Sequence, residues 1–297
     1  MNKLLIVVFV FMGLIVVSIG GAYLLTRDSA PLGDNIAVIE VHGVISSQQV
    51  DGLFGVQGAT PAVIRKQIEK AERDSSVKAI LIEVNSPGGT IVASEAIAEA
   101  ISDAEKPTVA WLGEMAASGG YYVASATDYI VADQGSMTGS IGVIFTFPQY
   151  DGMLEKLGVR MRVFKAGKYK DIASPYRNMT SEEEAIVNEW LMSAYDDFIQ
   201  VVADNRNLSN SYVRSVAEGN IYTGRKAVEL DLADAVGTRS EAIEIAAHMG
   251  GIEGEPGIVS YRERGFFSDF VGVASTRFGY GFARGLMASE NQGVPSY

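Results

Sequence analysis

Two kinds of hydrophobic pattern divide this chain near residue 30. Residues 4–25 are uncharged and mostly apolar, and as a helix they would be about 33 Å long, enough to cross the apolar core of a bilayer. A cleavable signal peptide is the alternative, but its apolar region is normally shorter and ends at a small-x-small site. The pattern therefore favours an uncleaved transmembrane anchor over residues 1–27, followed by a linker over residues 28–34.

Beyond the linker, apolar runs of strand length alternate with segments of helical periodicity. Strands are predicted over residues 35–45, 78–84, 107–112 and 128–132, and helices from Thr60-Pro61 onward and over residues 91–104 and 121–126. Runs that are apolar at most positions are typical of strands covered on both faces, as in a parallel sheet. Sites in such sheets lie outside the carboxyl ends of the strands, where two glycine-bearing loops, 85–89 and 115–120, are expected.

The later part of the chain is predicted to be mainly helical. Residues 181–184, Ser-Glu-Glu-Glu, are expected to form a capping box for a helix that ends near Asn205. Short helical pieces are expected over residues 210–237. One domain over residues 35–250 is therefore predicted, followed by a tail over residues 251–297 that begins with a glycine-rich connector. Aromatic residues, arginines and glycines alternate in this tail, which favours an oligomer, membrane-surface or active-site contact.

Composition excludes several classes of function. The net charge of −12 would repel a phosphate backbone, so no nucleic-acid partner is expected. The chain has no cysteine and only two histidines, His42 and His248, so neither a thiolate nor a histidine-rich metal centre is supported. We interpret His42, within a predicted strand, as structural. No cofactor is expected.

The sequence Met-Ala-Ala-Ser-Gly-Gly-Tyr-Tyr at residues 115–122 contains the strongest candidate for a nucleophile. Small residues precede Ser118 and two glycines follow it, so a hydroxyl and freed backbone N–H groups would meet at a strand-to-helix turn. Serine in a small-residue turn is also common without any chemistry. No histidine lies between His42 and His248 to serve Ser118, so the proton acceptor would have to be a lysine.

Lys170 is the candidate for that lysine, since it lies between Tyr169 and the Asp171-Ile172-Ala173 run. A lysine base must be neutral, and burial among apolar groups favours the neutral form. Asp171 opposes this, because a close carboxylate favours the charged ammonium unless its side chain points away. Lys165 and Lys168 are interpreted as solvated turn residues.

Four motifs occur in one order along the chain: NSPGG at residues 85–89, MAASGGYY at 115–122, TGSIGV at 138–143 and YKDIASP at 169–175. Together they resemble the short form of signal peptide peptidase A, membrane-anchored serine proteases with a Ser/Lys dyad. The resemblance covers roughly residues 35–240. It implies the α/β fold of the Clp-protease and crotonase-like group, with repeated ββα units and a mostly parallel sheet.

The resemblance also implies roles for individual residues. Ser118 would be the nucleophile, Lys170 the general base and Ser140 the hydroxyl that orients the lysine. Gly89 and Gly119 would supply the backbone N–H groups of the oxyanion hole, without a metal. The family further implies a homo-oligomer, an octamer-like ring or dome at the membrane, in which neighbouring subunits contribute the serine and the lysine.

One position departs from the family pattern. Relatives tend to have glycine after the helix of the TGRKAVEL segment, whereas this chain has Asp231, which tolerates the left-handed conformation less well. The difference concerns local packing.

The sequence therefore predicts a serine endopeptidase that cleaves hydrophobic peptides, such as remnant signal peptides, through an acyl-enzyme. Lys3 and the amino terminus mark the cytoplasmic side of a single-pass cell-membrane protein, so the catalytic domain is expected outside the cytoplasm. Two alternatives stay open: a crotonase-like enzyme acting on an acyl-CoA thioester, and a membrane scaffold without activity.

Overall fold

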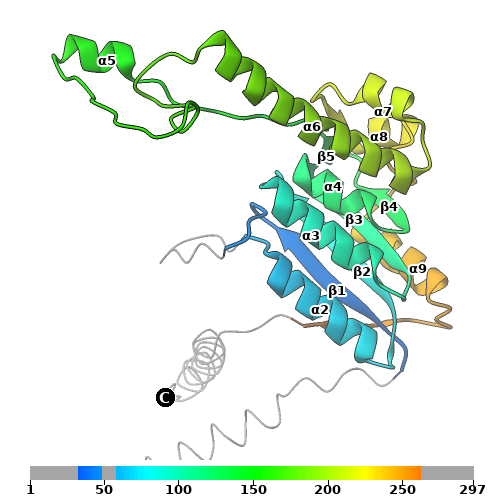
Figure 1. Cartoon of the computed structure of the whole chain (residues 1–297). Coiled ribbons are helices and arrows are strands. Elements are labelled where there is room, and N and C mark those ends of the chain that lie inside the picture. The colour runs from blue at the N-terminus through cyan, green and yellow to red at the C-terminus, as the bar shows by residue number, and fades with distance from the viewer. Residues whose placement is uncertain (1–32, 49–57, 262–297) are drawn as a thin grey trace, which may run out of the picture. The chain divides into compact units, whose positions relative to one another are not determined.

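A computed structural model of the chain describes residues 33–48 and 58–261 (Figure 1). The predicted anchor over residues 1–27 and residues 262–297 of the predicted tail lie outside these ranges. No helix within the described ranges is long and apolar enough to cross a membrane. The predicted sheet and its site-bearing loops lie within the described ranges.

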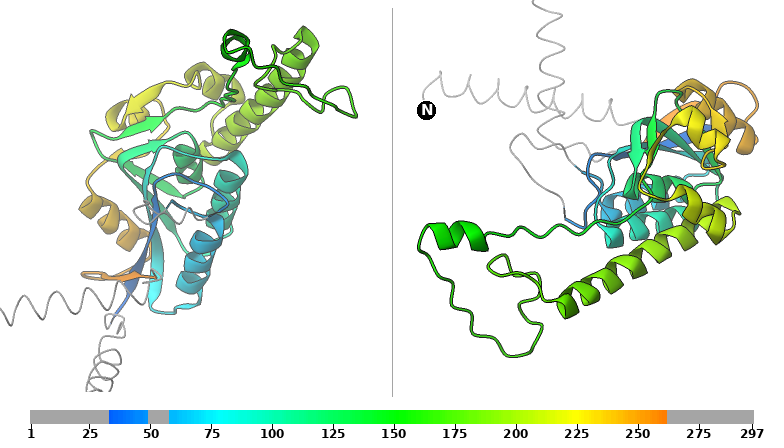
Figure 2. Two further views of the ribbon diagram at one scale, coloured as in Figure 1. Left: turned by 90° about the vertical axis from the view of Figure 1, so that its left-hand side faces the viewer. Right: turned by 90° about the horizontal axis from the view of Figure 1, so that it is seen from above.

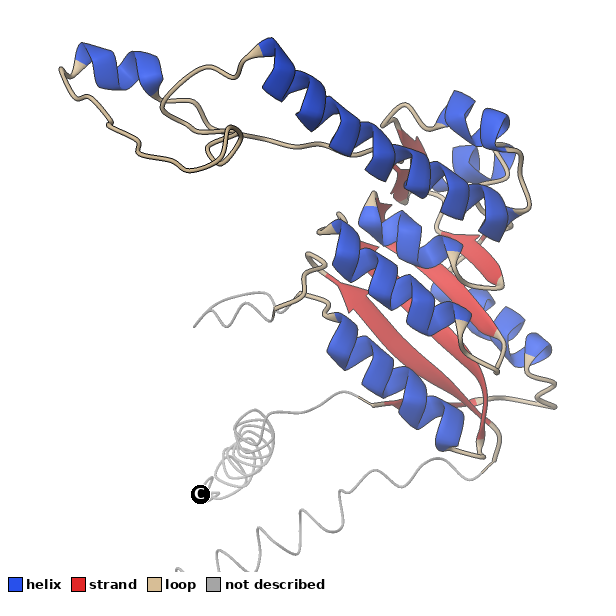
Figure 3. Cartoon of the chain, viewed as in Figure 1, coloured by secondary structure: helices blue, strands red, loops and turns tan. Residues whose placement is uncertain are grey.

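A mixed sheet, eight-stranded in the described part of the chain, forms the centre of the domain (Figure 3). Its main path runs β6-β5-β3-β2-β1-β8, and β4 and β7 branch from β3. All strand pairs are parallel except β5 with β6, which confirms the predicted mostly parallel sheet. The strands are β1 (Asn35–His42), β2 (Val77–Ser86), β3 (Thr108–Ala117), β4 (Tyr129–Ala132), β5 (Met137–Gly139), β6 (Ile221–Thr223), β7 (Ala235–Val236) and β8 (Gly257–Ser260).

Helices cover both faces of this sheet (Figures 1 and 3). On one face, α9 packs its alanines against Val38, Leu81 and Val109. The opposite face carries α2, α3 and α4. Double coverage explains why the strands are apolar at successive positions, and each fully buried Leu or Ile stabilises the fold by roughly 1.5–3 kcal/mol. The helices are α2 (Pro61–Arg73), α3 (Ile91–Ser102), α4 (Gly119–Ser125), α5 (Asp151–Lys156), α6 (Ser181–Arg206), α7 (Asn210–Val216), α8 (Gly224–Glu229) and α9 (Arg239–Met249).

Strand β3 changes partners along its length. Residues 109–112 pair with β4, whereas residues 115–117 pair with β5, so that Ala117 lies opposite Gly139. The predicted strand ended at residue 112, but the second pairing extends β3 to Ala117. The ends of β3 and β5 therefore meet, and the next residue of each strand is a serine.

The structure corrects two details of the sequence analysis. The capping box of α6 is formed by Thr180 and Glu183, one residue before the predicted pair, because the Thr180 hydroxyl accepts the Glu183 N–H and the Glu183 carboxylate accepts the Thr180 N–H. The sheet also continues past residue 250, since β8 pairs with β1 in parallel and includes residues expected in the tail.

A long segment between β5 and α6 projects from the sheet in all three views of Figures 1 and 2. It contains α5 and an irregular return to the start of α6, and we call residues 144–180 the arm. Most of its residues are exposed, including Ile144 at 85% and Phe164 at 88%. Exposed apolar side chains in such number are typical of a surface that meets a partner.

Asp231, after α8, has left-handed backbone angles, and substitutions there measure what this conformation costs in stability. Its φ is +56°, and the Leu232 N–H donates to the Ala227 carbonyl at 2.8 Å, so the chain turn requires this conformation. Left-handed backbone costs an L-residue about 1–2 kcal/mol, which glycine avoids. Glycine loses more conformational entropy on folding, and this loss offsets part of the gain in stability. We expect Asp231→Gly to raise the free energy of unfolding by about 0.5–1 kcal/mol, measured by denaturant titration, whereas Asp231→Ala should not; a gain with both would attribute the effect to the carboxylate.

Candidate active site

Ser118 lies at the turn between β3 and α4 with strained backbone angles. Its φ is +52° and its ψ is −122°, a conformation rarely adopted by residues other than glycine. The Ser118 N–H donates to the Gly139 carbonyl at 2.8 Å, so the pairing of β3 with β5 holds this conformation. A serine on a sharp, strained strand-to-helix turn is how α/β-hydrolases expose a nucleophile, although the G-x-S-x-G sequence is absent here.

Two backbone amides lie close to each other beside Ser118. A Cβ on Gly119 would come within 3.2 Å of the Gly89 nitrogen, and one on Gly89 would collide with the Ile45 carbonyl oxygen at 1.8 Å. Neither amide donates a backbone hydrogen bond within the described residues. Two amides that lie this close and have no backbone acceptor among the described residues can stabilise a developing oxyanion.

Two polar side chains at the end of β2, the buried Ser86 and the half-buried Asn85, hold the two loops in place. The Ser86 hydroxyl donates to the Gly43 carbonyl at 2.6 Å and accepts the Gly88 N–H at 3.0 Å. The Asn85 side chain accepts the Met115 N–H at 3.2 Å, which joins the loop at residues 85–89 to the strand that precedes Ser118. The sequence pattern predicted no role for either residue. The signal that could have revealed them was a polar pair at the end of an otherwise apolar strand.

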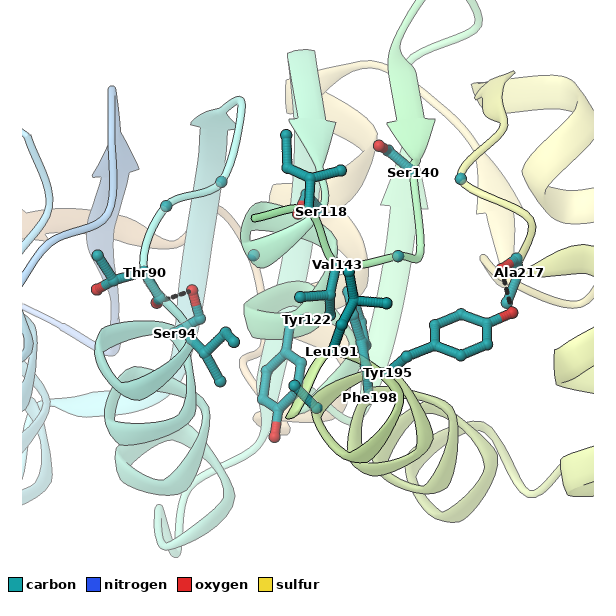
Figure 4. A pocket seen from close by; sticks show the side chains of 18 of the residues that line it. Thr90, Ser94, Ser118, Tyr122, Ser140, Val143, Leu191, Tyr195, Phe198 and Ala217 are labelled. Carbon is teal, nitrogen blue, oxygen red and sulfur yellow. Dashed lines mark hydrogen bonds between the residues drawn. The ribbon is translucent and has the colours of Figure 1, made fainter. Parts of the chain in front are cut away.

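Ser118 faces a cavity of about 1050 Å³ whose wall also includes Gly89, Gly119 and Ser140 (Figure 4). Ser140, the residue after β5, also has a positive φ, +50°, and its N–H donates to the Asn220 carbonyl at 2.7 Å. The structure thus gathers four of the five predicted site residues. A peptide segment could enter this cavity with its carbonyl near Ser118.

The opposite wall of the cavity is largely apolar. It is formed by side chains of α6, among them Leu191 and Phe198, together with Val143. The ring of Tyr122 lies 5.0 Å from that of Phe198. Burial, aided by the carboxylates of Glu95 and Asp197, raises the pKa of Tyr122 to about 12, so its hydroxyl stays protonated at neutral pH. Tyr122 therefore serves as wall and does not act as a base.

No lysine, arginine or histidine of the described residues lines the cavity. His42 lies 3.4 Å from Glu40 in an ion-pair geometry on β1, and His248 lies on α9. Lys170 is exposed on the arm and does not line the cavity. The chain by itself therefore does not bring Lys170 to Ser118. Within the described ranges, no group of acidic, histidine or cysteine side chains could hold a metal ion.

Comparisons with known proteins show the family of the chain. A model of peptidase family S49 matches residues 100–253, and a Clp protease model matches residues 53–131. The chain is 34% identical to a provisionally named protease of Methanocaldococcus jannaschii, over 96% of this chain and 94% of that one. It is 35% identical to a provisionally named signal peptide peptidase SppA of Enterococcus faecium, over 91% of this chain and 78% of that one.

A solved structure shares the fold. It is that of a serine-to-alanine mutant of the 1510-N membrane-bound stomatin-specific protease, with a TM-score of 0.53 and 16% identity over 78% of this chain and 99% of that one. At this identity the likeness concerns the fold alone. The fold and the family matches show a serine protease of the Clp-like α/β class. The chain belongs to peptidase family S49.

Gly119 offers a test of the paired amides. A Cβ at this position would lie 2.3 Å from the Ser94 hydroxyl oxygen and 3.2 Å from the Gly89 nitrogen. We expect Gly119→Ala to lower the free energy of unfolding by about 1–3 kcal/mol through overpacking, and to lower kcat for peptide cleavage by roughly 10²–10³ by crowding a donor.

Ser94→Ala combined with Gly119→Ala should recover much of the stability, because it removes the colliding hydroxyl, but should not recover activity. Gly152→Ala is the control, since a Cβ there meets nothing within 4 Å. Recovery of activity together with stability in the double variant would show that crowding of the donor is not the cause.

Proposed function

We propose that this protein is a membrane-anchored serine endopeptidase in which Ser118 attacks the peptide and Lys170 of a neighbouring subunit acts as general base. One observation carries the proposal: Ser118 faces a cavity that no described basic side chain lines, while Lys170 is exposed on a projecting arm. The Gly89 and Gly119 N–H groups beside Ser118 have no backbone acceptor among the described residues. In an assembly of several copies, Lys170 of one subunit would serve as the base for Ser118 of its neighbour.

The proposed reaction follows from these groups. The Ser118 hydroxyl oxygen attacks the scissile carbonyl carbon as its proton passes to the neutral amine of Lys170. The resulting oxyanion accepts hydrogen bonds from the Gly89 and Gly119 N–H groups. Lys170 then protonates the leaving amine, and water hydrolyses the acyl-enzyme by the reverse proton transfers. Ser140 is proposed to orient the lysine amine through its hydroxyl.

A second copy of the chain would also supply what the lysine needs. A general base must be neutral, and an exposed ammonium is stabilised by water, so Lys170 needs cover from apolar groups. The arm on which it lies carries exposed Phe145, Phe147, Met161 and Phe164. Burying these side chains against a neighbouring subunit would drive assembly and desolvate the lysine together, which supports a homo-oligomer such as the ring or dome implied by the family.

The proposed substrates are hydrophobic peptides, including remnant signal peptides. The apolar α6 wall of the cavity, with Leu191 and Phe198, suits apolar side chains next to the scissile bond. Residues 4–25, which lie outside the described residues, have the length and composition of a membrane anchor that would hold the catalytic domain on the extracytoplasmic side of the cell membrane. Substrates left in the bilayer would then be within reach.

The division of the dyad between subunits predicts complementation. Ser118→Ala and Lys170→Ala should each lower cleavage of a hydrophobic fluorogenic peptide by at least about 10³. Co-expression of the two variants should restore part of the activity, because mixed assemblies contain an intact Ser118 beside an intact Lys170.

Lys156→Ala is the matched control, since Lys156 is exposed on α5 of the same arm and belongs to none of the ion pairs around Lys170. It should retain activity. Complementation that fails although mixed assemblies form, as judged by native mass spectrometry, would refute the division between subunits. Peptide cleavage retained by Lys170→Ala alone would refute its role as base, and acyl-CoA turnover by Ser118→Ala would favour the crotonase-like alternative.

A lysine base also predicts the pH profile. Below the pH at which Lys170 loses its proton, kcat/KM should rise about tenfold per pH unit, because the rate follows the neutral fraction of the base. The nearby carboxylates do not contribute to this limb: Arg177 lowers the pKa of Glu183 to about 2 and holds that of Asp171 well below its usual range, so both stay ionised throughout. A profile that is flat from neutral to alkaline pH would exclude lysine as the base.

A further inference from the structure

A dense cluster of charges lies where the arm meets α6. Arg177 donates to both carboxylate oxygens of Asp171, from Nε at 3.0 Å and from Nη2 at 2.9 Å. It also donates to both oxygens of Glu183, from Nη1 at 2.7 Å and from Nη2 at 2.6 Å. One guanidinium thus joins two carboxylates from different parts of the chain. Bidentate pairs of this kind have fixed geometry, which lysine cannot reproduce.

Each of the two carboxylates has a separate structural position. Glu183 has only 3% of its surface exposed, and it accepts the Thr180 N–H at 2.9 Å in the capping box of α6. Asp171 immediately follows Lys170 in the chain, and its side chain is 14% exposed. Arg177 also donates to the Asp171 carbonyl at 3.2 Å. The turn that carries Lys170 is therefore fastened to the start of α6, whose later residues line the Ser118 cavity.

Within this cluster, each described carboxylate near Lys170 is bound by another side chain. Asp171 is bound by Arg177 and by Lys165, and Glu182 is bound by Lys168 and by the Tyr169 hydroxyl. Glu183 is bound by Arg177. Among the three lysines of residues 165–170, Lys170 alone makes no ion pair with a described residue. Every carboxylate of the cluster thus has a cation other than Lys170.

This arrangement removes the difficulty that Asp171, the neighbour of Lys170 in the chain, would favour the charged form of the lysine. A free carboxylate beside Lys170 would hold its ammonium charged, and a general base must be neutral. We propose that Arg177 is a positioning residue of the peptidase centre: it holds the Asp171 carboxylate away from Lys170 and fixes the lysine-bearing turn to α6. This inference rests on the proposed role of Lys170.

The test compares pH profiles of kcat/KM for the full-length, assembled protein on a hydrophobic fluorogenic peptide. Arg177→Gln releases the Asp171 carboxylate from its main partner, so the alkaline limb should move to higher pH by about 1 unit. Activity near neutral pH should fall about tenfold in consequence. Adding Asp171→Asn to Arg177→Gln removes the charge next to Lys170, and the limb should return toward its wild-type position. Glu183, which Arg177→Gln also releases, still accepts the Thr180 N–H.

Asp171→Asn alone keeps Arg177 and Lys165 without the charge they neutralise, so it should move the limb to lower pH. Because Asp171→Asn is predicted to shift the limb in the opposite direction, it tests the inference even if Arg177→Gln assembles poorly. Thermal unfolding and native mass spectrometry would reveal poor assembly. Arg177→Lys retains the charge without the two-pronged geometry, so it should lower kcat and leave the limb in place.

The inference is overturned if Arg177→Gln and Asp171→Asn lower activity equally at every pH without moving the limb, because that is the effect of a purely structural residue. Lys170→Ala separates this failure from failure of the proposed function. If Lys170→Ala cleaves the peptide, Lys170 is not the base and both proposals fall. If Lys170→Ala is inactive while the limb stays fixed in the Arg177 and Asp171 variants, only the role of Arg177 is refuted.

Discussion

The hydrogen bond from the Ser118 N–H to the Gly139 carbonyl is the constraint on which the candidate site depends. It continues the pairing of β3 with β5 by one residue and holds Ser118 in a conformation that is unfavourable for an L-residue. The same pairing ends at Gly139, which places Ser140 on the wall of the same cavity. A local strain of about 1–3 kcal/mol is therefore sustained by the sheet, whose buried strands contribute far more.

Polar side chains at the end of β2 link the paired strands to the glycine loops. Ser86 donates to the Gly43 carbonyl and accepts the Gly88 N–H, and Asn85 accepts the Met115 N–H. Because these bonds fix Gly88 and the start of the Ser118 segment together, the Gly89 and Gly119 amides are held near each other before any substrate arrives. Donors set in advance stabilise developing charge without reorganisation, which is the physical advantage of building them from backbone.

The arm, unlike the amides at the sheet edge, is not fixed by the sheet. It has few contacts with the sheet, exposes apolar side chains and concentrates ion pairs at its junction with α6. Ion pairs among its own side chains hold this segment to the start of α6. The division of the proposed dyad between a rigid sheet edge and a projecting arm would make peptidase activity depend on assembly, because a single chain does not hold Lys170 next to Ser118.

The sequence by itself determined the parallel α/β fold, the serine turn and the family, because apolar periodicity, glycine spacing and motif order are local properties. It placed the α6 cap one residue late, since Thr180-Ser181-Glu182-Glu183-Glu184 contains two possible capping boxes and Arg177 favours Glu183. It ended β3 at residue 112, since only pairing with β5 extends the strand. Only the tertiary structure decided the strain at Ser118, the separation of Lys170 from the cavity and the neutralisation of Asp171. These depend on which strand end meets which and where side chains point, and neither is encoded in local spacing.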